Sequence, residues 1–145
     1  MLSQKCKYAI RAVLFISAES DKEKGLKGSK DVSKTLNIPL AFTGKILQEL
    51  VKSNIISSNK GPGGGFYLTE DNLNAHVIEI VNVIDGLSFF KSCGLGLDRC
   101  SDEHPCPIHN TFKVGRDALL QLLRNKTINE LANEVKNNQS FLIRL

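Results

Sequence analysis

The feature that most constrains the fold of this chain is a glycine-rich turn, Asn59-Lys-Gly-Pro-Gly-Gly-Gly65, between two short apolar segments. Short β-prone segments on either side of a turn that contains glycine are typical of an antiparallel hairpin. We therefore expect strands over residues 55–58 and 66–69. The backbone of the tip can approach another molecule closely, because glycine has no Cβ atom.

Three helices are predicted before this hairpin. The first is capped by Ser3, contains a long apolar stretch and ends near Glu19. The second begins at Ser29, whose hydroxyl can cap it, and stops before Pro39, because the residue before a proline is pushed out of the α region. Pro39 can open the third helix, which runs from Leu40 to about Lys52 and has apolar residues at the 3.6-residue period.

Two short helices joined by a tight turn are typical of a helix-turn-helix, and a hairpin directly after them would serve as its wing. The glycines have two other interpretations, a simple tight turn or a nucleotide-binding loop. The second is disfavoured, because the Gly-Lys-Ser/Thr pattern is absent and no helix follows at once.

The charge is uneven along the 145 residues. Residues 1–75 contain 11 Lys and Arg against 7 Asp and Glu, a net charge of +4, whereas residues 76–145 contain 8 of each. A basic first half favours a polyanionic partner such as DNA, although a solvated lysine-rich surface would have the same composition.

The second half of the chain is expected to hold a short apolar helix over residues 75–84, a loop, a long helix over about 107–124, and a final helix capped by Thr127. The long helix has apolar or small residues at alternating spacings of four and three: Ile108, Phe112, Gly115, Leu119 and Leu122. Such a seam packs against the chain's own first helix or against a second copy, and we favour a homodimer.

The loop contains Cys93, Cys100 and Cys106, with His104 and His109 as competing fourth ligands. Clustered soft sulfur ligands suit an iron–sulfur cluster, zinc or copper(I). Structural zinc sites usually contain closely spaced cysteine pairs, which this loop lacks, and a disulfide switch also stays open. We favour His109, because its position at the start of a helix is better fixed. The fourth cysteine, Cys6, is expected to be a small buried residue.

Several classes of protein are disfavoured. No apolar run approaches the roughly 18 residues of a membrane span, and no secretory signal is evident, so we expect a cytoplasmic protein. Neither a Cys-x-x-Cys redox motif nor a nicotinamide fingerprint is present, so an enzyme is not expected.

The chain resembles the iron–sulfur cluster regulators of the IscR type over roughly residues 1–135. The resemblance rests on Tyr8-Ala9, Ile38-Pro-Leu40, Gly61-Pro-Gly-Gly-Gly-Phe66 and the set Cys93, Cys100, Cys106 and His109. It implies a mainly α fold with a small β-hairpin, in which a winged helix-turn-helix precedes a long dimerisation helix. It also implies that these four ligands hold a [2Fe–2S] cluster.

On this hypothesis, residues 1–75 bind double-stranded DNA at a near-palindromic operator. Residues 76–145 contain the sensor loop, about 91–109, and the dimerisation helix. The expected DNA contacts are Ser29, Phe42, Thr43, Lys45, Ser58, Lys60, Gly63, Gly64 and Gly65. The expected dimer contacts are Phe112, Gly115, Leu119 and Leu122.

Three departures from the resemblance bear on function. Lys7 stands where the nitric-oxide-sensing branch has an aspartate ligand, which favours His109 as the fourth ligand. Six residues separate Cys93 from Cys100, one more than is usual in the family. Gly44 replaces a glutamate tied to DNA sequence selectivity, and a missing carboxylate removes a group that could accept from cytosine.

Overall fold

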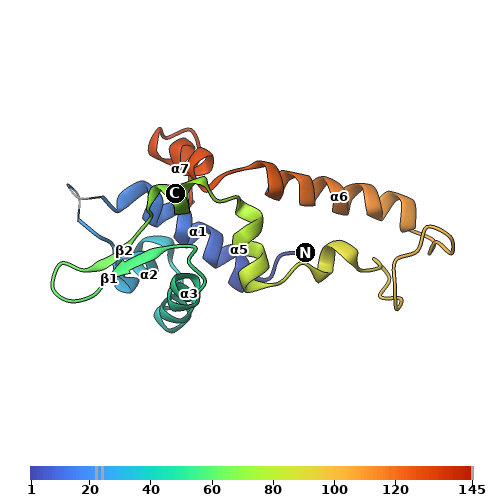
Figure 1. Cartoon of the computed structure of the whole chain (residues 1–145), viewed down its shortest axis with the longest axis horizontal. Helices are drawn as coiled ribbons and strands as arrows, with labels where there is room; N and C mark the ends of the chain where they lie inside the picture. Colours follow the sequence, from blue (N-terminus) through green and yellow to red (C-terminus); the bar gives the residue numbers. More distant parts are fainter. Residues whose placement is uncertain (22, 24, 145) are drawn as a thin grey trace.

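The fold was analysed in a computed structural model that describes residues 1–21, 23 and 25–144 (Figure 1). It is mainly helical with one two-stranded antiparallel sheet, as the sequence predicted. In chain order the elements are α1 (Gln4–Glu19), α2 (Ser29–Leu36), α3 (Leu40–Lys52), β1 (Ser57–Asn59), β2 (Gly65–Tyr67), α4 (Glu70–Asn74), α5 (Val77–Ile84), the 3₁₀ helix η1 (Ser88–Lys91), α6 (His109–Asn125) and α7 (Ile128–Lys136).

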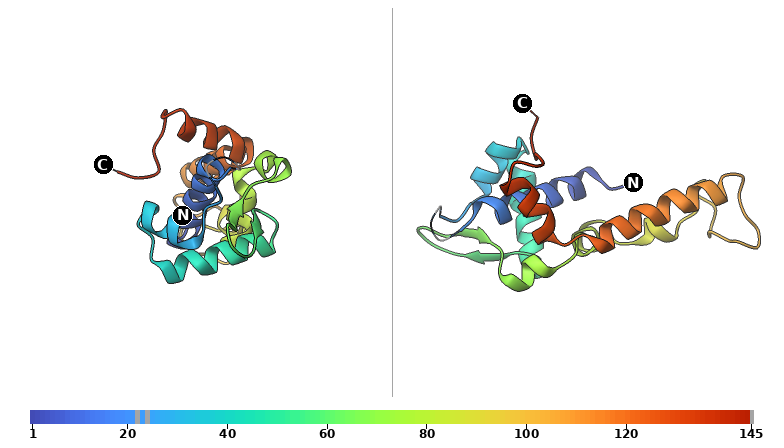
Figure 2. Two further views of the ribbon diagram at one scale, coloured as in Figure 1. Left: turned by 90° about the vertical axis from the view of Figure 1, so that its left-hand side faces the viewer. Right: turned by 90° about the horizontal axis from the view of Figure 1, so that it is seen from above.

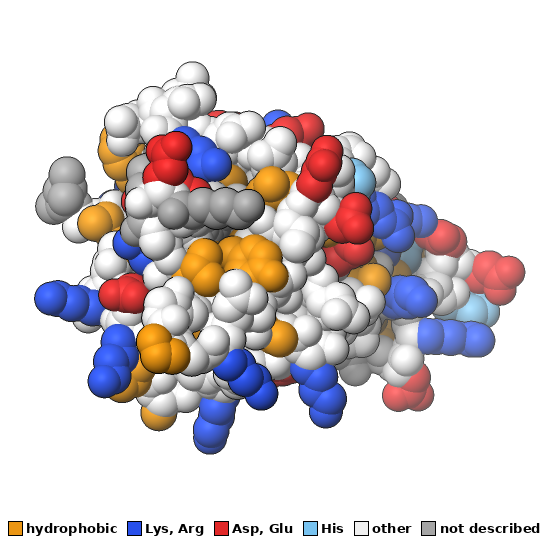
Figure 3. Space-filling view, turned by 60° about the vertical axis from the view of Figure 1, so that its left-hand side comes forward, with side chains coloured by type: hydrophobic (Ala, Val, Ile, Leu, Met, Phe, Trp, Pro, Cys, Tyr) orange, Lys and Arg blue, Asp and Glu red, His pale blue; other side chains and the backbone are white. Residues whose placement is uncertain are grey.

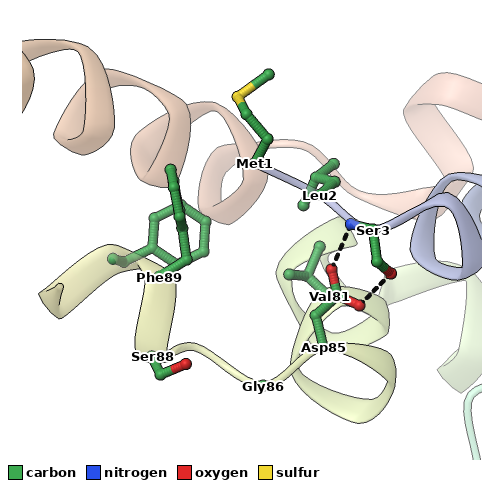
Figure 4. A pocket seen from close by; sticks show the side chains of 9 residues that line it. Met1, Leu2, Ser3, Val81, Asp85, Gly86, Ser88 and Phe89 are labelled. Atoms are coloured by element: carbon green, nitrogen blue, oxygen red, sulfur yellow. Dashed lines mark hydrogen bonds between the residues drawn. The ribbon is translucent and has the colours of Figure 1, made fainter. Parts of the chain in front are cut away.

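Helix α1 lies at the centre of the main core. It packs against α2, α3, α5 and α7, and every residue from Ala12 to Ala18 is buried. The predicted cap is confirmed, because Ser3 Oγ accepts from the Cys6 N–H at 3.0 Å. Ser3 also donates through its backbone N–H to Asp85 Oδ2 at 2.8 Å and through its hydroxyl to Asp85 Oδ1, which ties the start of α1 to the end of α5 (Figure 4).

The helix-turn-helix forms where the sequence predicted it, but one cap differs. Ser29 is the first helical residue of α2, and Gly28 is the cap. The Asp31 carboxylate, three residues after the cap, accepts from the Gly28 N–H at 2.9 Å, and no side-chain oxygen caps the first turn of α2. Helix α3 has the predicted bounds, with Pro39 as its cap rather than its first residue.

The hairpin is present and is slightly displaced from its predicted position. Ser57 pairs with Tyr67 and Asn59 pairs with Gly65, so each strand is three residues long. The Phe66 N–H donates to the Lys27 carbonyl at 2.8 Å, which attaches the wing to the segment before α2. The wing is therefore anchored to the helix-turn-helix at its base.

The second half of the chain extends away from this core. Figures 1 and 2 show α6 projecting from the body, with the cysteine loop at its far end. A smaller hydrophobic cluster of Cys6, Val77, Val81, Phe90 and Leu123 supports the base of α6. The short elements α4 and η1 were not predicted. Among the described residues, no helix is long and apolar enough to cross a bilayer.

Helix α7 returns to the main core, and a substitution of its first residue, Ile128, tests this packing. Ile128 is fully buried in the main core, within reach of α1. We expect Ile128→Ala to lower the free energy of unfolding by about 2–5 kcal/mol, because the shortened side chain leaves a cavity. Urea titration at one fixed protein concentration would measure this. The control Lys136→Ala, at the exposed end of the same helix, should change it by less than about 0.5 kcal/mol. Equal effects of the two substitutions would contradict the packing of α7.

Candidate cysteine-loop centre and nucleic-acid interface

The cysteine loop occupies residues 92–108, between η1 and α6. Its tip is largely exposed, whereas two of the expected ligands are buried. Cys93 and His109 are 8% and 4% exposed, and Cys100 and Cys106 are half-buried. His104 is exposed on the loop. The structure therefore orders His109, rather than His104, beside the cysteines.

Cys100 and His109 form one pair of potential ligands. The Cys100 sulfur lies 3.3 Å from His109 Nδ1, and His109 Nε2 lies 2.8 Å from Asp102 Oδ1. This arrangement favours the tautomer in which Nε2–H donates to Asp102 and Nδ1 has its lone pair directed towards Cys100. A metal-binding histidine commonly donates its other ring N–H to a carboxylate in this manner.

Asp102 was not among the predicted site residues. Lys113 Nζ donates to its two oxygens at 2.9 and 3.1 Å, so the carboxylate is held between a histidine and a lysine of α6. Hydrogen bonds from His109 and Lys113 keep the pKa of the Asp102 carboxyl below its ordinary value. Asp102 therefore stays ionised at neutral pH and orients the His109 ring.

Cys93 and Cys106 are the other two cysteines of the loop. The Leu95 N–H donates to the Cys93 sulfur at 3.4 Å. Backbone N–H groups of Leu95 and Leu97, together with contact to Cys106, lower the pKa of the Cys93 thiol. The loop backbone thus favours a thiolate, which is the form that binds metal.

Arg116 of α6 supports the loop. Its side chain is buried, it donates to the Ser92 carbonyl at 2.9 Å, and its interaction with Cys100 raises the pKa of its guanidinium. Sequence reasoning missed it, although the signal was present. His109, Arg116 and Leu123 are spaced by seven residues and are the buried residues of α6, so Arg116 lies on the helix face that the loop and η1 cover.

The donor types of the loop, three thiols and one imidazole, are ones that an iron–sulfur cluster can use, since histidine can replace cysteine as a ligand. Within residues 1–21, 23 and 25–144, no three His, Cys, Asp or Glu side chains are placed to hold one metal ion.

The candidate DNA surface is the outer face of α3 together with the wing. Lys45, Lys52 and Lys60 are exposed, and Phe42 is 53% exposed. Figure 3 shows lysine and arginine side chains gathered along the lower edge of the molecule, the level at which α3 lies in Figure 1. Lysine and arginine side chains beside an exposed helix can bind the phosphates of a DNA backbone.

One expected DNA contact is corrected by this geometry. Thr43 is 2% exposed, and its hydroxyl donates to the Pro39 carbonyl at 3.1 Å. Its side chain faces the core, because it shares a helical face with Ile46 and Leu47. Ser29 is half-buried at the start of α2, and Ser58 is exposed on β1.

The wing glycines have a structural reason of their own. Gly63 has a positive φ of 74°, and a Cβ atom at Gly64 would overlap the Asn59 carbonyl. A Cβ at Gly65 would lie 2.8 Å from the Lys27 carbonyl oxygen. The turn itself therefore requires glycine at these positions, and Lys60 and Gly63 are the exposed groups through which its tip could reach DNA.

The predicted dimer seam on α6 is partly covered within the chain. Phe112 and Leu119 are half-buried. The Phe112 ring packs edge-on against the Phe89 ring, with the ring centroids 6.2 Å apart. Leu122 is 57% exposed, and Gly115 has open space around it. Ile108, at 39% exposure, continues the uncovered apolar strip.

Comparison with known proteins gives a consistent result. A family model described as an iron-dependent transcriptional regulator, Rrf2, matches residues 2–134. The regulator IscR of Escherichia coli (strain K12 / DH10B) is 30% identical over 132 residues, which cover 91% of this chain and 80% of that protein.

Solved structures of similar fold include CymR, the global cysteine regulator of B. subtilis, with a TM-score of 0.72 and 21% identity. The match covers 92% of this chain and 96% of that one. T. potens IscR has a TM-score of 0.71 and 15% identity, over 97% of this chain and 92% of that one. Because both identities are below 25%, these two structures support the assignment of the fold alone.

The environments of the four cysteines predict an order of thiol reactivity. Burial, with Asp85 nearby, raises the pKa of Cys6 to about 12. At pH 8 Cys6 therefore stays protonated in the folded protein, whereas the lowered pKa of Cys93 favours its thiolate. In metal-free, reduced protein we expect iodoacetamide to label the loop cysteines well before Cys6, as mass spectrometry of peptides would show. In urea all four should react alike. Early labelling of Cys6 in the folded protein would contradict its burial.

Proposed function

Because this chain belongs to the Rrf2 family, and is therefore a DNA-binding transcriptional regulator rather than an enzyme, we propose that an iron–sulfur cluster on its cysteine loop switches its binding to DNA. The cluster is a [2Fe–2S] cluster held by Cys93, Cys100, Cys106 and His109. The family assignment confirms the resemblance to IscR-type regulators noted in the sequence.

The observation that carries this proposal is the arrangement around His109. The Cys100 sulfur lies 3.3 Å from His109 Nδ1, and His109 Nε2 lies 2.8 Å from Asp102 Oδ1. The other two cysteines, Cys93 and Cys106, lie in the same loop, and histidine can replace cysteine as a ligand of a [2Fe–2S] cluster. Arg116 donates to the carbonyl of Ser92, the residue before Cys93, so it holds the start of the loop against α6.

When bound, the cluster would supply one-electron redox chemistry and sensitivity to its own oxidation or loss. The residues around it would adjust that chemistry. A neutral imidazole in place of one thiolate makes the cluster less negative and raises its reduction potential. Asp102 orients His109, and the Leu95 N–H hydrogen bonds to the Cys93 sulfur.

The switch would act on DNA through α6. The loop is joined to the start of this helix, and Leu123 near its other end packs in the cluster that contains Cys6 of α1. A change in loop order would shift α6 relative to α1, and α1 packs against α3. A difference of only about 1.4 kcal/mol in DNA affinity between the two states changes the binding constant tenfold.

A second candidate switch is a disulfide between Cys93 and Cys106. Both lie in the same loop, and the lowered pKa of Cys93 favours its thiolate. A peroxide would oxidise this thiolate to a sulfenic acid, and attack by the Cys106 thiol would then form the disulfide and release water. The oxidized form of Staphylococcus aureus CymR, at 20% identity and a TM-score of 0.67, has the same fold. This candidate needs no metal, and iron analysis therefore separates it from the first.

We also propose a homodimer that uses the uncovered strip of α6 and reads a near-palindromic operator. Leu122 and Ile108 are exposed apolar residues on this helix, and the open space at Gly115 allows a partner helix to approach closely. The division into a DNA-binding part, 1–75, and a sensing and dimerising part, 76–145, belongs to this proposal, as does a cytoplasmic location.

The cluster is tested by purification without oxygen, followed by visible spectroscopy and iron and sulfide analysis. We expect a reddish protein with about two irons and two sulfides per chain, the content of a [2Fe–2S] cluster. The Cys100→Ala variant should lose the cluster, because one iron would keep a single protein ligand. His109→Ala should lose or shift the absorption, whereas the matched control His104→Ala should retain it. DNA binding is then compared in samples with and without iron.

Either of two results would remove the cluster from the proposal. A colourless, iron-free protein that cannot be reconstituted would favour the disulfide candidate. Full iron content in Cys100→Ala would refute the ligand set.

The dimer is tested by a pair of charge substitutions on α6. Leu122→Glu should convert the protein to monomers in sedimentation experiments, because a buried, unpaired carboxylate would destabilise the interface. Val114→Glu is the matched control, since Val114 is 71% exposed and lies on another side of the same helix. Dissociation by both substitutions, or by neither, would contradict the proposed strip.

A further inference from the structure

We propose that α3 reads A·T base pairs in the major groove, with Gln48 contacting adenine and with Ala41 and Phe42 contacting thymine methyl groups. This inference rests on the DNA-binding function. It assigns the class of base pair that the protein selects and adds two residues, Ala41 and Gln48, to the candidate contacts.

The burial pattern of α3 defines the face that can enter a groove. Its buried residues are Thr43, Ile46, Leu47 and Leu50. At 100° per residue, the opposite side of the helix has Ala41, Lys45, Gln48 and Lys52, and all four are exposed. In a helix-turn-helix the recognition helix presents its N-terminal residues to base edges. Ala41 and Gln48 therefore lie on the reading face, Ala41 in the first turn of the helix and Gln48 about two turns further along.

Gln48 has the chemistry that adenine requires. Its amide can donate to N7 and accept from the N6 amino group in a bidentate contact, the pairing typical of glutamine with adenine. Within residues 1–21, 23 and 25–144, no hydrogen bond engages the Gln48 side chain. The neighbouring lysines, Lys45 and Lys52, supply charge for phosphates on the same face.

The reading face lacks an acceptor for cytosine. Glu49 is the single acid of α3, and it pairs with Lys5 of α1 at 2.6 Å, away from the centre of that face. Gly44 has no atom within 4 Å of a Cβ position, so a side chain would fit there, yet none is present. Reading of the cytosine N4 amino group by a carboxylate is thus absent from this helix.

The apolar groups at the start of α3 suit thymine. Leu40 and Phe42 are 49% and 53% exposed, so both side chains are accessible to a base. The Phe42 ring is supported edge-on by Tyr8 of α1, with ring centroids 6.4 Å apart. The C5 methyl group of thymine is the apolar group that the major groove offers, and Ala and Phe contact it.

The experiment uses the full chain and starts from selection of duplexes out of a random pool at fixed salt. Within the enriched half-site, each thymine is then replaced by deoxyuridine, which lacks only the methyl group. Each adenine is replaced by 7-deazaadenine, which lacks only the N7 acceptor. Fluorescence anisotropy measures the affinity of the unaltered protein for every duplex, so the result does not depend on whether a variant folds.

We expect enriched half-sites with A·T pairs at defined positions. Deoxyuridine should weaken binding about threefold or more at one or two positions, and 7-deazaadenine should weaken it about tenfold at one position, within the range of a good bidentate contact. Gln48→Ala should remove the 7-deazaadenine penalty, and Phe42→Ala should remove a deoxyuridine penalty. Lys60→Ala, on the wing, is the control and should weaken binding to all duplexes while leaving both penalties unchanged.

The outcomes separate this inference from the function on which it rests. If no duplex is enriched and the protein does not bind DNA, the DNA-binding function itself fails. If duplexes are enriched but both base analogues are tolerated, or if the defined positions are G·C pairs, DNA binding stands and the inference is overturned.

Discussion

The burial of α1 is the constraint on which the rest of the structure depends. Over the run from Ala12 to Ala18 the helix has no face towards solvent. A helix that is apolar all round must be enclosed by other elements, and α2, α3, α5 and α7 enclose this one. The first half of the chain supplies two of those helices and the second half supplies the other two. Neither half can bury α1 alone, so the DNA-reading part and the sensing part share one core.

This shared helix also gives the proposed switch a physical route. Cys6 on α1 packs with Phe90 and Leu123 at the base of α6, and Tyr8, two residues further on, supports Phe42 on α3. Close-packed interiors transmit displacement rather than absorb it. A displacement at the base of α6 would therefore move α1, and with it Tyr8, which packs against Phe42 on α3. The route is short because a single rigid helix carries both contacts.

Sequence patterns predicted the elements that have long apolar periods or strong caps. The bounds of α3 follow from its 3.6-residue period and Pro39, and Ser3 and Thr127 cap α1 and α7 as expected. The expected cap at Ser29 was wrong, because α2 begins one residue earlier than a Ser29 cap would allow: Gly28 is the cap, and Asp31 accepts from its N–H. The five-residue helix α4 is too short to show a period, although its capping box at Thr69 is a local signal.

The candidate centre was less predictable, because ligand spacing does not determine which donors meet. Three cysteines and two histidines allow many pairings, and the loop has few buried apolar residues to select one. The selection comes instead from polar side chains of α6. Arg116 donates to the Ser92 carbonyl, and Lys113 holds Asp102, which hydrogen bonds to His109.

Arg116 is buried under the loop, and because an unpaired buried charge is costly, the loop must supply it with a partner, the Ser92 carbonyl. The loop in turn keeps its shape only while Arg116 and Lys113 hold it. Helix and loop therefore specify each other. Loosening the loop would expose Arg116 to water and remove the contacts that orient His109, so order in the loop and order in the ligand set are lost together.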